Sequence, residues 1–396
     1  MLTLDEIRDE RNKAKLLVKQ GIDPRTKKTA DKIEAQAEID EIIIAEEQKR
    51  TAKFTFNDLY KTWIKDGVNR ADDNKFIMLT FDNHAIPQLG NVEVSKLSED
   101  HLREIYRKII SAGKVATAVE LSKDIGQMLR WAEKRKPWRA LLVDGNPSEL
   151  VEIKKLVPKG YTKERKRLLS EDEIKKLKSI FDEKTQNYIN ASKKYGTERP
   201  LKKEVQLAMW ICLGTLCRIG ELLMTEWKHV DFDKRTWFIP AENVKGEGSQ
   251  KRDQLVYLSD FVLDKFYQLN KLTGDALWVF PARYKEGHVC VKSASKQVGD
   301  RQIKFKNRTK KLQAHVENDS LVLGEVEWTP HDLRRTGATM MQQLKPRVSR
   351  EVINLCQNHV IGSKVDRVYL LDDYADDKRD AWVRLGCRLE EILKEV

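Results

Sequence analysis

Apolar residues in the first part of the chain recur three and four positions apart, the spacing of an amphipathic helix. Residues 3–20 and 30–50 predict two highly charged helices, separated by a turn in the sequence IDPRTKKT. Thr3 and Glu6 have the spacing of a capping box at the start of the first helix. Neither helix is apolar enough to form a core alone. Residues 1–53 are therefore expected to connect to a segment upstream.

Residues 54–153 continue the helical pattern and predict a bundle of four or more helices joined by short loops. The first helix is TFNDLYKTWIK, whose aromatic and aliphatic residues share one face. The second covers 75–85 and is expected to break at Pro87, and the third begins after Ser98. The fourth, ATAVELSKDIGQMLRWAEKR, ends before Pro137. An all-α domain is predicted.

The pattern changes after residue 169. Ser170 begins a helix, and a further helix is predicted over 201–226. The runs HVDF, RTWFIP and QLVYLS are short, aromatic and β-branched, and turn residues separate them, which predicts a three-stranded antiparallel sheet. Helices then resume at 260–272, 330–343, 349–357 and 375–393. Residues 170–396 are thus expected to form an α+β domain that is mainly helical.

Positive charge is concentrated in three stretches. The chain has 74 Lys and Arg against 62 Asp and Glu, a net charge of +12. Residues 123–139, 154–178 and 296–311 carry +4, +6 and +6, so the rest of the chain is slightly acidic. Residues 154–169 also contain Pro158, which favours an interdomain linker. Such clustering is typical of a protein that binds the phosphate backbone, although each cluster alone could be a solvated face.

The composition excludes several classes of protein. No apolar run of about eighteen residues is present, and the charged N-terminal sequence does not fit a secretory signal. Five dispersed cysteines without a CxxC pair argue against a disulfide framework and a structural zinc site. A soluble protein of a reducing compartment is expected.

Four local patterns, taken in order, resemble the active-site motifs of the tyrosine recombinase (phage integrase) family, in particular the integrases of satellite phages and genomic islands. They are GTLCRIGELLMTEWKHVDF with Arg218, NVKGEGSQKR with its lysines, TPHDLRRTGAT with His331 and Arg334, and NHVIGSKVDRVY with His359 and Tyr369. A His-x-x-Arg pair alone is a weak signal. Four matches in the family's order, each on the expected secondary-structure element, are a strong signal. The resemblance extends over residues 54–396.

The resemblance implies a domain organisation. Residues 54–153 would be a core-binding domain of the SAM-like helical type, and 154–169 a basic linker. Residues 170–396 would be the catalytic domain, with an exchange tail at 375–396 that often docks on a neighbouring protomer in this family. Members of this type usually begin with an arm-binding domain, so residues 1–53 are expected to follow a domain that this chain lacks.

The resemblance also implies a reaction in which a tyrosine attacks a DNA phosphate. The implied catalytic residues are Arg218, Lys245, His331, Arg334, His359 and the nucleophile Tyr369. Two guanidiniums suit the phosphate because each offers a planar fork that stays protonated. The histidines would bond the remaining oxygen and assist proton movement, and the lysine would protonate the leaving 5′-oxygen. The 3′-phosphotyrosine link stores the bond energy, so no ATP, metal or other cofactor is implied.

Two assignments have alternatives in the sequence. Lys245 and Lys251 both lie in the turn between the second and third strands, and the position of Lys245 fits the family better. Tyr369 and Tyr374 both follow His359. Tyr369 is favoured because its distance from the histidine matches the family.

The predicted function is that of an integrase that inserts and excises a prophage or genomic island in the cytoplasm of a bacterial host, at the nucleoid. The implied partners are double-stranded DNA attachment sites, three further copies of the chain in a homotetramer, an excisionase and a DNA-bending host factor, with no membrane. Candidate phosphate contacts are Lys123, Arg130, Lys134 and Arg139, which could equally form a solvated helix face. A type IB topoisomerase and a non-catalytic DNA-binding regulator are the competing hypotheses.

Overall fold

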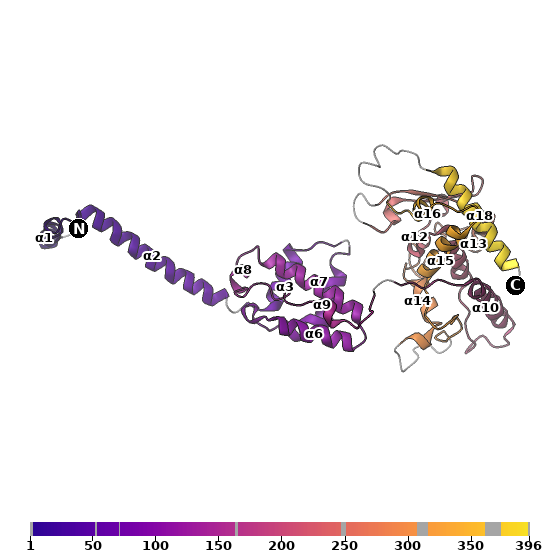
Figure 1. Ribbon diagram of the computed structural model, residues 1–396, viewed down its shortest axis with the longest axis horizontal. Helices are drawn as coiled ribbons and strands as arrows, with labels where there is room; N and C mark the ends of the chain where they lie inside the picture. The colour runs from indigo at the N-terminus through magenta and orange to yellow at the C-terminus, as the bar shows by residue number, and fades with distance from the viewer. Residues whose placement is uncertain are drawn as a thin grey trace. The chain divides into compact units, whose positions relative to one another are not determined.

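The computed structural model describes residues 3–51, 54–70, 72–162, 165–246, 251–306, 316–360 and 374–394. The chain divides into two compact units, Met1–Glu164 and Arg165–Val396 (Figure 1). Among the described residues, none of the helices combines the length and the apolar character needed to cross a membrane.

The first unit begins with two charged helices, α1 (Leu4–Lys19) and α2 (Pro24–Thr51). The predicted capping box is present, because the Thr3 hydroxyl accepts a bond from the Glu6 amide at 3.4 Å. None of the α1 residues is buried. The turn predicted for IDPRTKKT is wrong over most of its length, since α2 already begins at Pro24. Proline fits the first helical position, where its missing N–H costs no hydrogen bond.

Helices form the rest of the first unit. They are α3 (Phe56–Asp66), α4 (Lys75–Thr80), a π-helical turn (Phe81–Ala85), α5 (Ile86–Leu89), a 3-10 turn (Val94–Lys96), α6 (Glu99–Ser111), α7 (Val115–Ala132), α8 (Trp138–Leu141) and α9 (Ile153–Leu156). Phe56, Trp63 and Phe81 are fully buried in their core, together with Leu102 and Leu121. This confirms the predicted all-helical bundle.

The helical path does not break at Pro87, contrary to the prediction. It continues through the π-helical turn and α5, which places Pro87 in the first turn of α5. A proline ring clashes with the carbonyl four residues earlier in a regular α-helix. A wider π turn directly before the proline changes that spacing, so the chain can continue to Gly90.

The second unit is mainly helical with one small sheet. Its helices are α10 (Glu171–Asn190), α11 (Lys203–Thr215), α12 (Ile219–Leu223), α13 (Asp260–Thr273), α14 (Ser293–Gly299), α15 (Pro330–Gln343), α16 (Arg350–Cys356) and α18 (Ala375–Lys394), with 3-10 turns at Trp227–His229, Ala241–Asn243 and Ile303–Phe305. The strands are β1 (Val230–Asp231), β2 (Thr236–Ile239) and β3 (Gln254–Tyr257). They pair antiparallel in the order β1-β2-β3, with Trp237 opposite Val256. The predicted fold class is confirmed, although α14 was not predicted.

The helix predicted over 201–226 is two helices. Leu216 adopts the left-handed conformation (φ 61°) and ends α11, and Arg218 has an extended backbone and caps α12. Apolar residues fill both sides of this break, so hydrophobic periodicity could not reveal it. The break takes Arg218 out of a helix interior and places it at a helix N-terminus.

The buried helix α11 is the centre of the second unit, and it packs against α13, α15 and α18. Its contact with α15 is close at Gly337, where a Cβ atom would lie 2.2 Å from the carbonyl oxygen of Leu213. Any larger residue there would push α15 away from α11. The last helix, α18, lies beside α13 and α16 of the same unit (Figure 1). Its Trp382, Leu385 and Leu389 are buried in the core of that unit.

Candidate active site

Arg218 is held by a single carboxylate at the start of α12. Glu221 accepts a hydrogen bond from the Arg218 backbone amide at 2.8 Å and one from its Nη1 at 2.6 Å. The Glu221 side chain is only 2% exposed, whereas 26% of the Arg218 side chain is exposed. The carboxylate therefore fixes the guanidinium from the protein side and leaves its other face open to solvent.

Arg334 lies in the first half of α15 and is almost completely buried. Its Nη2 donates to the carbonyl oxygen of Gln357 at 2.5 Å, and its Nη1 lies 4.0 Å from Glu221 Oε2. Within the described part of the chain, Nη1 makes no hydrogen bond. Burial and the nearby Arg218 lower the pKa of Arg334 to about 10, so the side chain is still charged at neutral pH.

His359 reaches Arg334 because the chain turns sharply at the end of α16. Asn358 adopts the left-handed conformation (φ 54°), which asparagine tolerates better than most residues. The Nη2 of Arg334 lies 3.3 Å from His359 Nε2, and since a guanidinium only donates, Nε2 accepts. Burial, followed by Arg334 and Arg218, lowers the pKa of His359. The ring is therefore neutral at pH 7.

His331 lies one turn before Arg334, immediately after the proline that begins α15. Partial burial and the charges of Arg334 and Arg335 lower its pKa, so this ring is also neutral at pH 7. The charges of Arg218 and Arg334 act on both histidines. The structure thus brings together four of the six predicted catalytic residues.

The remaining predicted catalytic residues are Lys245 and Tyr369. Tyr369 lies outside the described residues. Lys245 and Lys251 are exposed and lie on either side of the undescribed residues 247–250. Tyr374 is described, and its partly buried side chain packs against the hydrophobic core just before α18. The choice between Lys245 and Lys251 and the role of Tyr369 remain predictions.

Residues that the sequence analysis missed hold the segment around His359. Arg252 donates from Nε to the side-chain oxygen of Asn358 at 2.9 Å and from Nη2 to the backbone oxygen of His359. Gln254, the first residue of β3, donates to the backbone oxygen of Cys356 at 2.8 Å. Arg252 is the last residue of the motif NVKGEGSQKR, in which only the lysines were singled out as candidates. Gln254 begins the strand that follows, and no sequence signal singled it out.

The four candidate phosphate contacts lie on one part of the first unit. Lys123 and Arg130 are on α7, Lys134 follows it, and Arg139 is on α8. All four are exposed. Lys123 also forms an ion pair with Glu120 at 3.3 Å. Exposure is compatible with DNA contact and with a solvated face, so these assignments remain predictions.

The first turn of the last helix contains two aspartates. Asp376 and Asp377 lie in the first turn of α18, where carboxylates interact favourably with the helix dipole. In the part of the chain that the structure describes, no group of three or more His, Cys, Asp or Glu side chains is arranged to hold a metal ion.

Comparisons with protein-family models identify the family. The model of the phage integrase family matches residues 167–374, which is just over half of the 396 residues. The chain belongs to the phage integrase family. The phage integrase central domain also matches, over residues 56–140. These matches confirm the family resemblance inferred from the ordered motifs.

Two curated members of the phage integrase family show the extent of the likeness. The integrase of Enterobacteria phage P4 is 23% identical over 289 residues, which cover 71% of this chain and 57% of that protein. The prophage integrase IntA of Escherichia coli (strain K12) is 22% identical over 383 residues, covering 96% of this chain and 77% of that protein. The chain therefore matches little more than half of the length of the P4 integrase.

Solved integrase structures share the fold. A lambda integrase dimer bound to a COC' core site superposes with a TM-score of 0.55 at 13% identity, covering 89% of this chain and 91% of that one. The integrase of transposon Tn1549, in complex with a circular intermediate DNA, gives a TM-score of 0.51 at 14% identity, covering 80% and 98%. At these identities the likeness shows the fold.

We expect Glu221→Gln to destabilise the protein, because the substitution removes the buried negative charge beside Arg218 and Arg334. Glutamine keeps a hydrogen-bond acceptor but leaves the two guanidiniums without a counter-charge. The free energy of unfolding should fall by about 2 kcal/mol, measured by urea denaturation with tryptophan fluorescence. Glu390→Gln, which breaks only the α18 surface pair with Lys394, should cost less than about 1 kcal/mol. Equal losses in both variants would contradict the role of Glu221.

Proposed function

We propose that this protein is a site-specific tyrosine recombinase, which cleaves and rejoins duplex DNA through a 3′-phosphotyrosine intermediate and so integrates and excises a prophage or genomic island. The observation that carries the proposal is the buried Nη1 of Arg334, which makes no hydrogen bond among the described residues. An unpaired charged donor is costly to bury, so a ligand that pairs with it would be strongly favoured. A phosphate diester supplies both the acceptor and the charge.

The balance of charge at the site supports the same ligand. Arg218 and Arg334 share one buried carboxylate, that of Glu221, so the three groups together carry one net positive charge. The neutral histidines do not offset that charge. A monoanionic phosphodiester would complete the balance, and the two guanidinium forks would stabilise the additional charge of its pentacoordinate transition state.

The remaining roles are part of the same proposal. Tyr369 attacks the phosphorus, and its phenolic proton passes to a neutral imidazole, His331 or His359, acting as a general base. Lys245 donates a proton to the departing 5′-oxygen. In the reverse direction, the 5′-hydroxyl of a partner strand attacks the phosphotyrosine and releases the tyrosine, so the number of phosphoester bonds is conserved.

The proposed recombinase binds DNA with both units. Residues 54–153 would act as the core-binding domain, 154–169 as the linker, and 170–396 as the catalytic domain. One solved relative is a lambda integrase tetramer bound to a Holliday junction, which has a TM-score of 0.55 with this chain. By analogy we propose that four copies of this chain act together on paired attachment sites.

Trapping of a covalent intermediate tests the proposed function. The probe is a duplex with the element's own attachment site and a nick beside the cleavage position, so that the short released strand diffuses away. We expect an adduct that survives denaturing electrophoresis and a free 5′-hydroxyl on the released strand. DNA binding without an adduct would indicate a regulator. Relaxation of a supercoiled plasmid that lacks the site would indicate a type IB topoisomerase.

DNA binding should depend steeply on salt, because phosphate contacts release counterions. Arg130→Gln should weaken binding to all sequences and reduce the slope of log K against log salt by about 1. The measurement is fluorescence anisotropy of labelled duplex at several salt concentrations. Lys108→Gln, an exposed lysine on α6, is the matched control and should leave the slope unchanged. Identical slopes for both variants would show that Arg130 does not contact a DNA phosphate.

A further inference from the structure

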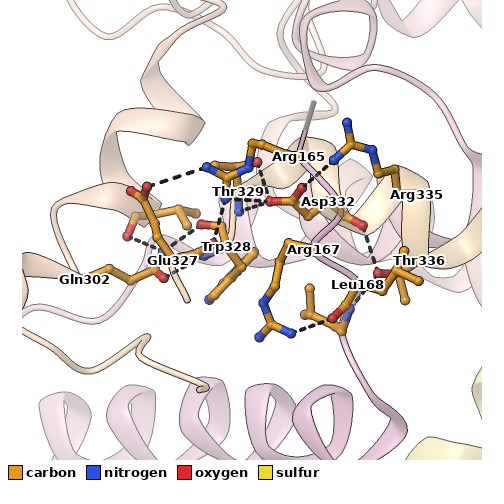
Figure 2. Close-up of polar contacts among 12 residues, drawn as sticks. Arg165, Arg167, Leu168, Gln302, Glu327, Trp328, Thr329, Asp332, Arg335 and Thr336 are labelled. Atoms are coloured by element: carbon orange, nitrogen blue, oxygen red, sulfur yellow. Dashed lines mark hydrogen bonds and ion pairs between the residues drawn. The ribbon is translucent and has the colours of Figure 1, made fainter. Parts of the chain in front are cut away.

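The first residues of the second unit lie along the helix that carries His331 and Arg334. Residues 165–169, here called the connector segment, precede α10 and run beside the first half of α15 (Figure 2). The backbone amide of Leu169 donates to the Thr336 hydroxyl of α15 at 2.9 Å. The connector segment is therefore bonded to α15 in addition to the covalent path through α10.

Arg165 makes two further bonds at the start of α15. Its Nη2 donates to the backbone oxygen of Glu327 at 2.6 Å and to Asp332 Oδ2 at 3.1 Å (Figure 2). The side chain of Asp332 is completely buried, whereas 41% of the Arg165 side chain is exposed. One partly exposed guanidinium thus reaches a carboxylate in the interior, next in sequence to His331.

Asp332 organises the first turn of α15. It accepts hydrogen bonds from the backbone amide and the hydroxyl of Thr329, both at 2.9 Å, which completes the N-terminal cap. It also lies 3.3 Å from the Nη1 of Arg335. A buried carboxylate is favourable only when charged and polar partners surround it, and Arg165 is one of its two cationic partners in the described structure.

The segment before α15 is also held from the interior. Gln302 accepts from the Trp328 amide at 3.0 Å and donates to the Trp328 carbonyl at 2.8 Å (Figure 2). The indole of Trp328 donates to the backbone oxygen of Leu321 at 2.8 Å. These contacts fix the entry to the helix without involving the connector segment. The contribution specific to Arg165 is therefore the contact with Asp332 and Glu327.

We propose that Arg165 is a positioning residue, which aligns His331 and Arg334 through Asp332 and so links the seating of the connector segment to DNA cleavage. The inference rests on the proposed recombinase function. His331 and Arg334 flank Asp332 on the same helical turn, so a shift of that turn displaces both. A displacement of about 1 Å at a reacting group can reduce a rate about 100-fold.

The competing explanation is that Arg165 only contacts a DNA phosphate. Arg167 offers a matched control, because it lies in the same segment but its Nη1 bonds Glu173 of α10 at 2.9 Å. Arg165→Gln and Arg167→Gln remove the same charge from the same stretch. A phosphate contact alters the DNA affinity and its salt dependence, whereas a positioning contact alters the cleavage rate at saturating DNA.

The test is single-turnover formation of the covalent adduct on the nicked attachment-site duplex, with the DNA affinity measured in parallel. We expect Arg165→Gln to slow adduct formation about 10- to 100-fold at saturating DNA, and Arg167→Gln to leave the rate within about twofold. In an Asp332→Asn background, Arg165→Gln should have little further effect, because the two residues act as one unit. Arg165→Lys should recover most of the rate by restoring the charge beside Asp332.

The possible outcomes distinguish failure of the positioning role of Arg165 from failure of the proposed recombinase function. Equal rates for wild type and Arg165→Gln, or equal losses for Arg165→Gln and Arg167→Gln, would overturn the positioning role while leaving the recombinase intact. Absence of any adduct from the wild type would overturn the proposed function and this inference with it. If Arg165→Gln proves unfolded by circular dichroism, Arg165→Lys and Asp332→Asn decide the question by the same measurement.

Discussion

Tyr369→Phe should abolish the covalent DNA adduct completely, while DNA affinity stays within about twofold of wild type. Phenylalanine keeps the aromatic ring but lacks the oxygen that forms the phosphoester bond, so neither cleavage nor strand transfer has a nucleophile. The measurement is adduct formation on the nicked attachment-site duplex, with anisotropy to follow binding. This is the largest effect expected of any single substitution in the chain.

Tyr374→Phe is the matched control for that experiment. Tyr374 lies directly before α18, its backbone oxygen accepts the Lys378 amide at 2.9 Å, and its side chain packs against the hydrophobic core. These contacts give it a structural role, so we expect the adduct to form at a rate close to that of wild type. Persistence of the adduct in Tyr369→Phe together with its loss in Tyr374→Phe would reverse the assignment.

Arg218→Lys should slow adduct formation about 100- to 1,000-fold at saturating DNA, which corresponds to about 3–4 kcal/mol in the barrier. Lysine keeps the positive charge but loses the planar fork that can bond two phosphate oxygens at once. Arg218 suits this test better than Arg334 because it is partly exposed, whereas Arg334 is buried and bonded to the Gln357 carbonyl. The stability of the fold should change little.

The control is Arg235→Lys, since Arg235 pairs with Asp260 at 2.6 Å on the surface of the same unit. We expect its cleavage rate to equal that of wild type. A rate loss of less than about fivefold in Arg218→Lys would indicate that its guanidinium does not contact the phosphate in the transition state. Weaker DNA binding with an unchanged cleavage rate at saturating DNA would indicate that Arg218 contributes to DNA affinity alone.

The arrangement of Arg218 and Arg334 around Glu221 explains how two like charges are kept close together before DNA binds. A single buried carboxylate orients one arginine by direct bonds and lies 4.0 Å from the other. A second carboxylate would neutralise the remaining positive charge of the two arginines and so reduce their attraction for phosphate. Burial, followed by the charge of Arg218, lowers the pKa of Arg334 to about 10, and a bound phosphodiester would offset both effects by pairing with the guanidinium.

Local patterns in the sequence were sufficient to predict most of the elements and the family. Helical spacing predicted the bundle of the first unit, and the change to short β-branched runs predicted the three strands and their antiparallel pairing. Capping residues such as Ser170 marked helix starts correctly, because a cap acts on the amides of the next three residues. The ordered motifs around Arg218 and His331 were sufficient to predict the family, which the comparisons confirm.

Tertiary structure decided where the site residues lie. The chain leaves α11 at Leu216 because the left-handed backbone ends the helix there, and apolar periodicity continues through that point. Arg252 and Gln254 meet the segment around His359 only after about 100 residues of intervening chain fold between them. Contacts between residues so far apart in the sequence depend on tertiary packing, so the spacing of hydrophobic residues cannot predict them.

The sequence by itself therefore determined the family, through the order of its motifs, and named the four residues Arg218, His331, Arg334 and His359 that the structure brings together. The tertiary structure alone decided that the buried Nη1 of Arg334 makes no hydrogen bond among the described residues, that Glu221 serves two arginines, and that the boundary residue Arg165 reaches Asp332. The physical reason is that burial and charge pairing depend on all neighbours in space. Only the folded chain specifies those neighbours.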